Sequence, residues 1–246
     1  MKSPSLTDKV ALITGAGRGI GRGIALAFAR EGAALILTAR SADQLDAVAE
    51  EAAEVSREKV VVQVADVTDE QQVEQLFARV SSEFGRLDLL VNNAGAFDGG
   101  PLDQLSVEAW DRVISTNLRG PFLCTRAALR LMKPRKSGRI INIGSIAAQR
   151  VRPNSAPYAA SKHGLWGLTQ ITALEGREYG VTCGAIHPGN VQVERRQASG
   201  RTEDDEPMMT AGDIAEVAVL MASLPPHVEM LEAIVLPSRQ AYVGRG

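Results

Sequence analysis

The chain has 246 residues, 45% of them hydrophobic, which suits a single α/β domain around one large core. Its 27 basic and 29 acidic residues leave a net charge of -2, so neither nucleic acid nor an anionic membrane is an expected partner. Two cysteines without metal-ligand spacing, and the lack of an apolar run of about 18 residues, lead us to expect a cytoplasmic protein without a metal site.

The first apolar run, residues 10–14, leads into a glycine-rich turn and then into a helical pattern over residues 24–33. Strand, glycine turn and helix in this order predict a phosphate site, because glycine lets the backbone approach a pyrophosphate closely and the helix N-terminus offers N–H groups. The residues expected to bind there are Gly15, Gly17, Arg18, Gly19, Ile20 and Gly21. A tight strand-to-helix connection is the alternative.

Residues 34–40 form the second predicted strand, and its end lacks the acid that binds the ribose 2′-hydroxyl of NAD in sites of this kind. Arg40 lies there instead. Together with Arg18 it would pair with a 2′-phosphate through charge-assisted hydrogen bonds. We therefore expect NADP(H) in preference to NAD(H), although both arginines could also be solvated surface residues.

Strands and helices then alternate. Capping-box spacing predicts two helix starts, in the pairs Ser41 with Gln44 and Thr68 with Gln71. Further strands are predicted over residues 60–66 and 87–91, the first ending at Asp66. This alternation predicts an α/β fold with a doubly wound parallel sheet and helices on both faces, which binds its ligand at the carboxyl edge of the strands.

A long helix is predicted over residues 106–132, disturbed at Gly120 and Pro121 because proline has no N–H to donate. Asn117 lies just before this point. A buried asparagine usually satisfies backbone groups, but at a disrupted turn it can also hold an ordered water.

The next strand, residues 139–145, ends at Ser145, and residues 155–168 predict the start of a helix. Tyr158 and Lys162 lie one helical turn apart, on the same face. A nearby ammonium favours the ionised phenolate, which would make Tyr158 an acid or base. A half-buried helix tyrosine beside a solvated lysine is the alternative.

A strand over residues 181–185 is followed by His187, Pro188 and Gly189. We expect His187 to be structural. The polar segment 190–209 predicts either a flexible surface loop or a substrate loop beside the site. Thr210 is then expected to cap a helix that ends near residue 223, and residues 231–236 to form the last strand.

Seven motifs in this order resemble the single-domain short-chain dehydrogenase/reductase family over nearly the whole chain: Thr14-Gly15-x-x-x-Gly19-Ile20-Gly21, Asp66-Val67, Asn92-Asn93-Ala94-Gly95, Asn117, Gly144-Ser145, Tyr158-x-x-x-Lys162 and Pro188-Gly189. The resemblance implies one Rossmann-type domain, residues 1–246, with a seven-stranded sheet. It further implies a homotetramer or dimer. It implies catalysis by Asn117, Ser145, Tyr158 and Lys162. It assigns further nicotinamide-cofactor contacts to Asp66, Val67, Asn93, Ala94, Gly95, Tyr158, Lys162, Pro188, Gly189 and Val191.

The activity that the resemblance implies is hydride transfer between a nicotinamide and a carbonyl or alcohol substrate by a Ser–Tyr–Lys mechanism. Val193 departs from the family by replacing a common threonine. The tail resembles the 3-hydroxy acid (serine-type) dehydrogenase branch, which favours small β-oxo or β-hydroxy substrates. Two alternatives stay open: a 3-oxoacyl-carrier-protein reductase, and a catalytically silent NADP-binding sensor, against which the intact catalytic set argues.

Overall fold

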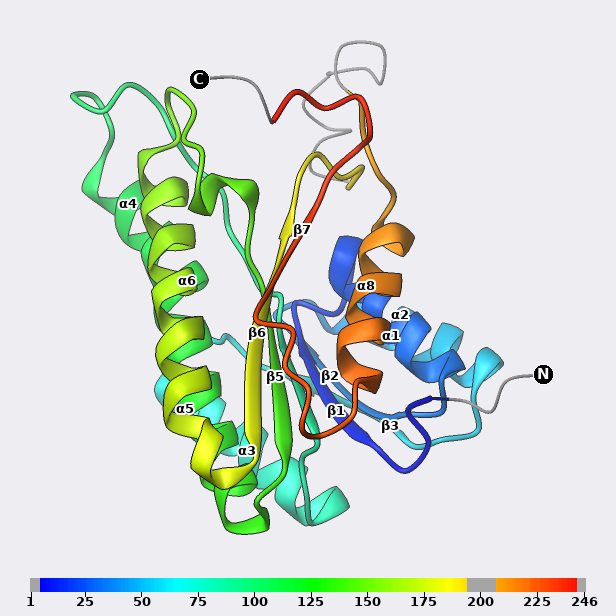
Figure 1. The fold of residues 1–246 in the computed structure, drawn as a ribbon. Helices are drawn as coiled ribbons and strands as arrows, with labels where there is room; N and C mark the ends of the chain where they lie inside the picture. The colour runs from blue at the N-terminus through cyan, green and yellow to red at the C-terminus, as the bar shows by residue number, and fades with distance from the viewer. Residues whose placement is uncertain (1–4, 194–206, 243–246) are drawn as a thin grey trace.

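The computed structural model describes residues 5–193 and 207–242. Seven strands form one sheet in the order β3-β2-β1-β4-β5-β6-β7, and every neighbouring pair is parallel (Figure 1). The strands are β1 (Val10–Thr14), β2 (Ala34–Ala39), β3 (Val60–Val64), β4 (Leu89–Asn92), β5 (Gly138–Ile143), β6 (Val181–Pro188) and β7 (Glu232–Val235). The predicted doubly wound, seven-stranded sheet is confirmed.

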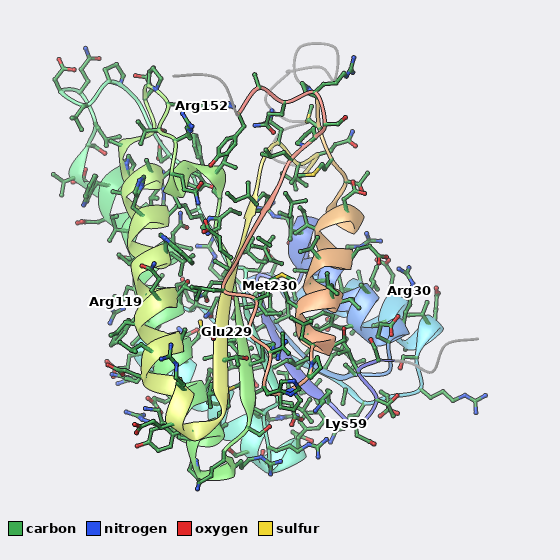
Figure 2. The ribbon with its side chains drawn as sticks, viewed as in Figure 1. Arg30, Lys59, Arg119, Arg152, Glu229 and Met230 are labelled. Carbon is green, nitrogen blue, oxygen red and sulfur yellow. The ribbon has the colours of Figure 1, made fainter. Side chains whose placement is uncertain are left out.

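Helices cover both faces of this sheet (Figure 1). The apolar sides of α1, α2 and α8 pack on one face, and those of α3, α5 and α6 on the other. The helices are α1 (Gly19–Arg30), α2 (Ala42–Val55), α3 (Glu70–Phe84), α4 (Val107–Ile114), α5 (Gly120–Met132), α6 (Ala156–Gly176) and α8 (Ala211–Ser223). Because both faces are covered, the central strand β1 is buried along its whole length. Charged side chains such as Arg30, Lys59 and Arg119 lie on the outside (Figure 2).

The strand order reverses beside β1, which pairs with β2 through Leu12↔Ile36 and with β4 through Leu12↔Leu90. The chain therefore builds the sheet outward from β1 in one direction and then, from β4 onward, in the other. In open α/β sheets such a reversal leaves a crevice outside the carboxyl ends of the strands, where ligands bind. The fold thus positions the site before any side chain is considered.

The predicted caps are only partly correct. Ser41 precedes α2 but makes no capping hydrogen bond with its side chain. Asp69, not Thr68, caps α3, accepting from the backbone N–H of Gln71 at 2.8 Å and of Gln72 at 3.1 Å. Either residue type can cap a helix, so the spacing alone did not separate these neighbours. Thr210 caps α8 in a full capping box, as predicted.

The long helix predicted over residues 106–132 consists of α4, a π-helical turn η1 (Ser115–Arg119) and α5. Pro121 has no N–H to donate to the carbonyl of Asn117, four residues earlier, so the regular α-helical ladder is interrupted at Asn117 itself. Such π turns occur frequently at functional sites. Short 3₁₀ segments complete the fold at η2 (Lys133–Arg135), η3 (Ile146–Ala148) and η4 (Arg177–Tyr179).

The two ends of the predicted loop 190–209 lie together. Gln192 donates its backbone N–H to Met209 at 2.8 Å, and Met209 donates to Asn190 at 2.9 Å. Residues 194–206 of this loop lie outside the described residues. In the described part of the chain, the helices lack the length and apolar character needed to cross a membrane.

Candidate active site

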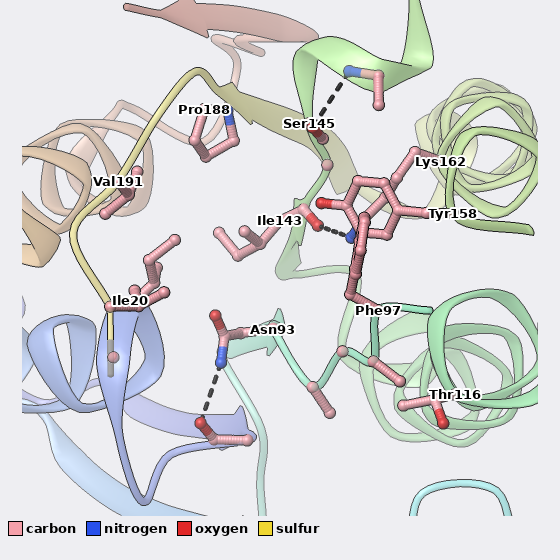
Figure 3. Close-up of a pocket in the computed structure, with 18 of the residues that line it drawn as sticks. Ile20, Asn93, Phe97, Thr116, Ile143, Ser145, Tyr158, Lys162, Pro188 and Val191 are labelled. Atoms are coloured by element: carbon pink, nitrogen blue, oxygen red, sulfur yellow. Dashed lines mark hydrogen bonds between the residues drawn. The ribbon is translucent and has the colours of Figure 1, made fainter. Parts of the chain in front are cut away.

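A cavity of about 1110 Å³ opens at the carboxyl edge of the sheet. Figure 3 shows that its walls come from opposite sides of the fold, with Ile20 on one side and Tyr158 on the other. The predicted site residues that line it are Gly15, Gly17, Arg18, Gly19, Ile20, Arg40, Asp66, Val67, Asn93, Ala94, Gly95, Ser145, Tyr158, Lys162, Pro188, Gly189 and Val191. Gly21 and Asn117 were also predicted, and neither lines the cavity.

The glycine turn between β1 and α1 leaves no room for side chains. Gly15 has a φ of 63°, and a Cβ on Gly21 would lie 2.2 Å from the carbonyl oxygen of Gly15. A Cβ on Gly17 would lie 2.9 Å from the Cβ of Gln44. The backbone therefore forms the cavity wall directly, where α1 begins and its first N–H groups have no partner within the helix. This cradle fits the pyrophosphate of a dinucleotide.

Asn93 fastens the glycine turn to the end of β4. Its Nδ2 donates to the carbonyls of Thr14 and Gly15, both at 3.0 Å. In return, Thr14 Oγ1 accepts from the backbone N–H groups of Asn93 and Ala94, both at 3.0 Å. Two strand ends that are far apart in the sequence thus form one connected wall.

Arg18 and Arg40 both line the cavity with exposed side chains. Within residues 5–193 and 207–242, neither has an ion-pair partner. Asp66 also lines the cavity, but its Oδ1 already accepts from the backbone N–H of Thr68 at 2.9 Å and from the Thr68 hydroxyl at 2.8 Å. This part of the cavity is therefore suited to an anionic group.

Tyr158 and Lys162 share one face of α6, as predicted, and Lys162 is buried rather than solvated. Its Nζ donates to the carbonyl of Ile143 at 2.8 Å and lies 5.6 Å from the centroid of the Tyr158 ring. The ring of Phe97 packs against Tyr158 with the centroids 5.2 Å apart. Figure 3 shows the Tyr158 hydroxyl pointing into the cavity on the side of Ser145. The alternative of a solvated lysine is wrong.

Ser145 follows β5 and begins the short segment η3, where its Oγ accepts from the backbone N–H of Ala147 at 3.1 Å. Its backbone contacts the imidazole of His187, whose Nδ1 lies 2.9 Å from the Ser145 carbonyl oxygen. The serine hydroxyl and the tyrosine hydroxyl therefore come from different elements but line the same cavity. Two hydroxyls and a buried ammonium form a set that can stabilise a developing oxyanion and transfer a proton.

Asn117 is fully buried in the π turn, away from the cavity wall. Its Oδ1 accepts from the backbone N–H of Ala96 at 2.7 Å, and its Nδ2 donates to the Ala96 carbonyl at 2.9 Å and to Ser161 Oγ at 3.1 Å. Both N–H donors of the side chain are thus used within the protein. The side chain fixes the segment after β4, and the main-chain carbonyl is the group that lacks its α-helical donor.

Comparison with known proteins identifies the family to which the chain belongs. The family model described as short chain dehydrogenase matches residues 9–204. The chain belongs to the short-chain dehydrogenase family. It is an oxidoreductase of that family.

Relatives of this short-chain dehydrogenase cover most of the chain. A 3-oxoacyl-[acyl-carrier-protein] reductase of Synechocystis sp. is 42% identical over 191 residues, 77% of each chain. An uncharacterised oxidoreductase of Staphylococcus aureus is 35% identical over 232 residues, covering 94% of this chain and 98% of the relative.

Solved structures of other short-chain oxidoreductases resemble this chain in fold. Levodione reductase matches with a TM-score of 0.87 and 32% identity over 94% of this chain and 96% of its own. A metagenomic short-chain oxidoreductase in complex with NADP matches with a TM-score of 0.84 and 34% identity over 95% and 99%.

Several cavity-lining residues of this dehydrogenase were not predicted. Gln44, Thr116 and Ile143 line it from α2, the π turn and β5. None belongs to a motif, and Gln44 was expected to take part in a helix cap. Each residue lines the cavity because the strand order brings its element to the carboxyl edge of the sheet. A local sequence pattern does not predict the strand order. Val193, which replaces the family's common threonine, also lines the cavity.

Proposed function

We propose that this short-chain dehydrogenase transfers a hydride between NADP(H) and a carbonyl or alcohol substrate by a Ser–Tyr–Lys mechanism, chiefly in the direction of reduction. The observation that supports this most is that Ser145, Tyr158 and Lys162 share one cavity with the glycine turn. The alternative function, a catalytically silent NADP-binding sensor, has no such support, because the chain keeps all four predicted catalytic residues: Asn117, Ser145, Tyr158 and Lys162.

The nicotinamide, when bound, supplies the hydride. Negative charge develops on the substrate oxygen during reduction, and the hydroxyls of Ser145 and Tyr158 would stabilise it by hydrogen bonds. Tyr158 then donates its proton as the general acid. The buried ammonium of Lys162 favours the phenolate that remains, since opposite charges attract strongly where water is excluded.

Asn117 would contribute a water through which the proton on Tyr158 is replaced. Its side chain is occupied by Ala96 and Ser161, so we assign this role to its main-chain carbonyl, which Pro121 deprives of a donor. Asn117 thus has two tasks: the side chain holds the neighbouring loop and the backbone holds the water.

Tyr158→Phe tests the mechanism. We expect turnover to fall at least about 1000-fold, since the general acid and one oxyanion donor are lost together. Affinity for NADPH should change little. Turnover is measured as NADPH oxidation with a panel of ketones, aldehydes, diketones and β-oxo acids and esters. Activity retained in the variant would rule out Tyr158 as the acid.

Arg40→Ala tests the preference for NADP(H). Loss of a guanidinium that pairs with the 2′-phosphate should lower kcat/KM for NADPH by about tenfold or more and leave that for NADH nearly unchanged. Arg30→Ala, at the exposed end of α1 (Figure 2), is the matched control. Equal effects on the two cofactors would contradict the assignment.

Two substrate classes remain candidates. Arg112, which pairs with Asp98, lines the cavity together with Arg150 and Arg152, and the positive charge of this part supports small β-oxo acids, in keeping with the resemblance of the tail. The Synechocystis relative supports an acyl-carrier thioester. Competition between a small β-oxo acid and an acyl-carrier thioester would separate them, because the true substrate should show the higher kcat/KM by orders of magnitude.

We further propose one Rossmann domain over residues 1–246 with a substrate loop at about 190–209. A cytoplasmic location and a homotetramer or dimer stay predictions. Light scattering coupled to size-exclusion chromatography would measure the assembly.

A further inference from the structure

His187 is the one deeply buried histidine, and the mechanism above does not use it. It lies near the end of β6, and its side chain is 1% exposed. The indole of Trp166 meets it edge-on, with ring centroids 5.5 Å apart. A Cβ on Gly144 would lie 2.6 Å from His187 Nδ1, so the glycine before Ser145 is what gives the imidazole room.

The Nδ1 of His187 faces the backbone of Ser145. It lies 2.9 Å from the Ser145 carbonyl oxygen and 3.3 Å from the Ser145 nitrogen. One ring nitrogen cannot donate and accept at once. The shorter contact is satisfied when Nδ1 carries the proton and donates to the carbonyl.

The other nitrogen, Nε2, is buried and has no hydrogen-bond partner in the described part of the chain. The Glu232 carboxylate on β7 lies 3.6 Å away, and the same Oε1 accepts from the side chain of Gln149, four residues after Ser145. Burial lowers the pKa of His187, Lys162 on α6 lowers it further, and the Ser145 carbonyl and Glu232 oppose them. The net direction is toward a neutral ring with one proton.

We propose that His187 is a positioning residue for Ser145: its Nδ1–H holds the Ser145 carbonyl and thereby directs the serine hydroxyl toward the reacting oxygen. The proposal rests on the function proposed above, because it concerns the orientation of the Ser145 hydroxyl, which stabilises the oxyanion in that function. Gly144 then has a defined purpose, which is to admit the imidazole.

A matched pair of variants tests this. In His187→Asn the side-chain amide can take the place of Nδ1, whereas His187→Leu has a similar branch without a donor. We expect His187→Leu to lower kcat by about tenfold or more, since a misplacement of ~1 Å costs up to about 100-fold. His187→Asn should retain most of kcat, and the Kd for NADPH should be unchanged in both.

Equal losses in the two variants, or a weakened Kd for NADPH with unchanged kcat, would overturn the proposal. If the Leu variant does not fold, as judged by its melting temperature, His187→Gln replaces it. The amide of glutamine lies one bond farther out, toward Glu232 rather than Ser145, so kcat should again fall while the Asn variant keeps it.

A double-mutant cycle separates positioning from general structural damage. Because His187 acts through Ser145, His187→Leu should not lower the rate of NADPH oxidation further in a Ser145→Ala background. This rate is measured by single-turnover NADPH oxidation at high enzyme concentration. If His187→Leu lowers the rate by the same factor in both backgrounds, the proposal is contradicted. Wild-type turnover and its loss in Tyr158→Phe are measured alongside, so a failure of the proposed function is recognised separately.

Discussion

At the scale of single residues, Lys162 is a buried ammonium beside the ring of Tyr158. The side chain is 5% exposed and is held by one main-chain carbonyl, that of Ile143, at 2.8 Å. A charge in such a place is costly to desolvate, and a hydrogen bond to a buried carbonyl offsets part of that cost. The chain thus keeps a buried charge beside a tyrosine that lines the cavity.

Lys162→Met should separate the effect of this charge on stability from its effect on turnover. Methionine keeps the apolar stem and removes the charge, so the desolvation cost disappears together with the donor to the buried Ile143 carbonyl, and we expect the melting temperature to change little. Turnover should fall by about 100-fold or more, because a preorganised charge near the reacting groups is lost. The measurements are thermal unfolding and NADPH oxidation. A variant that is both active and unstable would show that Lys162 is a structural residue.

At the scale of elements, Arg139 at the start of β5 ties three parts of the chain together. Its guanidinium is buried and donates to the carbonyls of Met221 in α8, of Pro225 at 3.2 Å and of Val228 at 3.0 Å. Desolvation lowers the pKa of this guanidinium, and Glu229 partly offsets the shift. The hydrogen bonds therefore anchor the end of α8 and the segment leading to β7.

Arg139→Met should lower the free energy of unfolding by roughly 2–4 kcal/mol, since buried carbonyls lose their donors. Urea unfolding measures this. Arg130→Met is the control: Arg130 is an exposed arginine that pairs with Glu74 at 2.9 Å and should contribute under ~1 kcal/mol. Equal changes in both variants would mean that the buried contacts do not anchor α8.

Most elements were predictable because their patterns are local. An uninterrupted apolar run between polar residues and glycine predicts β1 at its observed bounds, Val10–Thr14. The choice of Asp69 over Thr68 as the cap of α3 depends on where the chain leaves β3, and Pro121 predicts a disturbed helix near Asn117 but not that the disturbance is a π turn. These features follow from tertiary geometry, so sequence patterns placed them only within a few residues.

At the scale of the whole molecule, the motifs predicted most of the residues that line the cavity, but not the contacts that hold them there. The acceptor for Lys162 is the carbonyl of Ile143, which no side-chain pattern marks. Glu232 reaches His187 because β7 pairs with β6 in a register that brings their ends together. Such partners are far apart in the chain and are determined by the order of strands.

The stability of the whole molecule should depend on pH in two windows. His187 has a pKa below its ordinary 6.5, so below that pH the unfolded chain binds a proton that the folded chain resists, and the free energy of unfolding falls. Asp69, Glu70 and Glu83 have pKa values lowered by hydrogen bonds to Gln72, Arg126 and Lys59, so they add a further loss only below their ordinary values of 3.8 to 4.5.

Urea unfolding from about pH 8 to about pH 5 measures the first window. The wild-type free energy of unfolding should decline below pH 6.5, and His187→Asn should flatten the decline because the titrating group is gone. A slope that is identical in the two proteins would assign the decline to other groups.

The tail of the chain has a consequence for biosynthesis. The side chain of Gln240 accepts from the backbone N–H of Asn190 at 2.8 Å, and the Tyr242 hydroxyl donates to Gln149. The last described residues therefore hold segments that border the reaction centre. A growing chain has its glycine turn early, but it gains these contacts only after residues 240 and 242 have been added. A polypeptide that stops before residue 240 would therefore lack the contacts that hold these two segments beside the cavity.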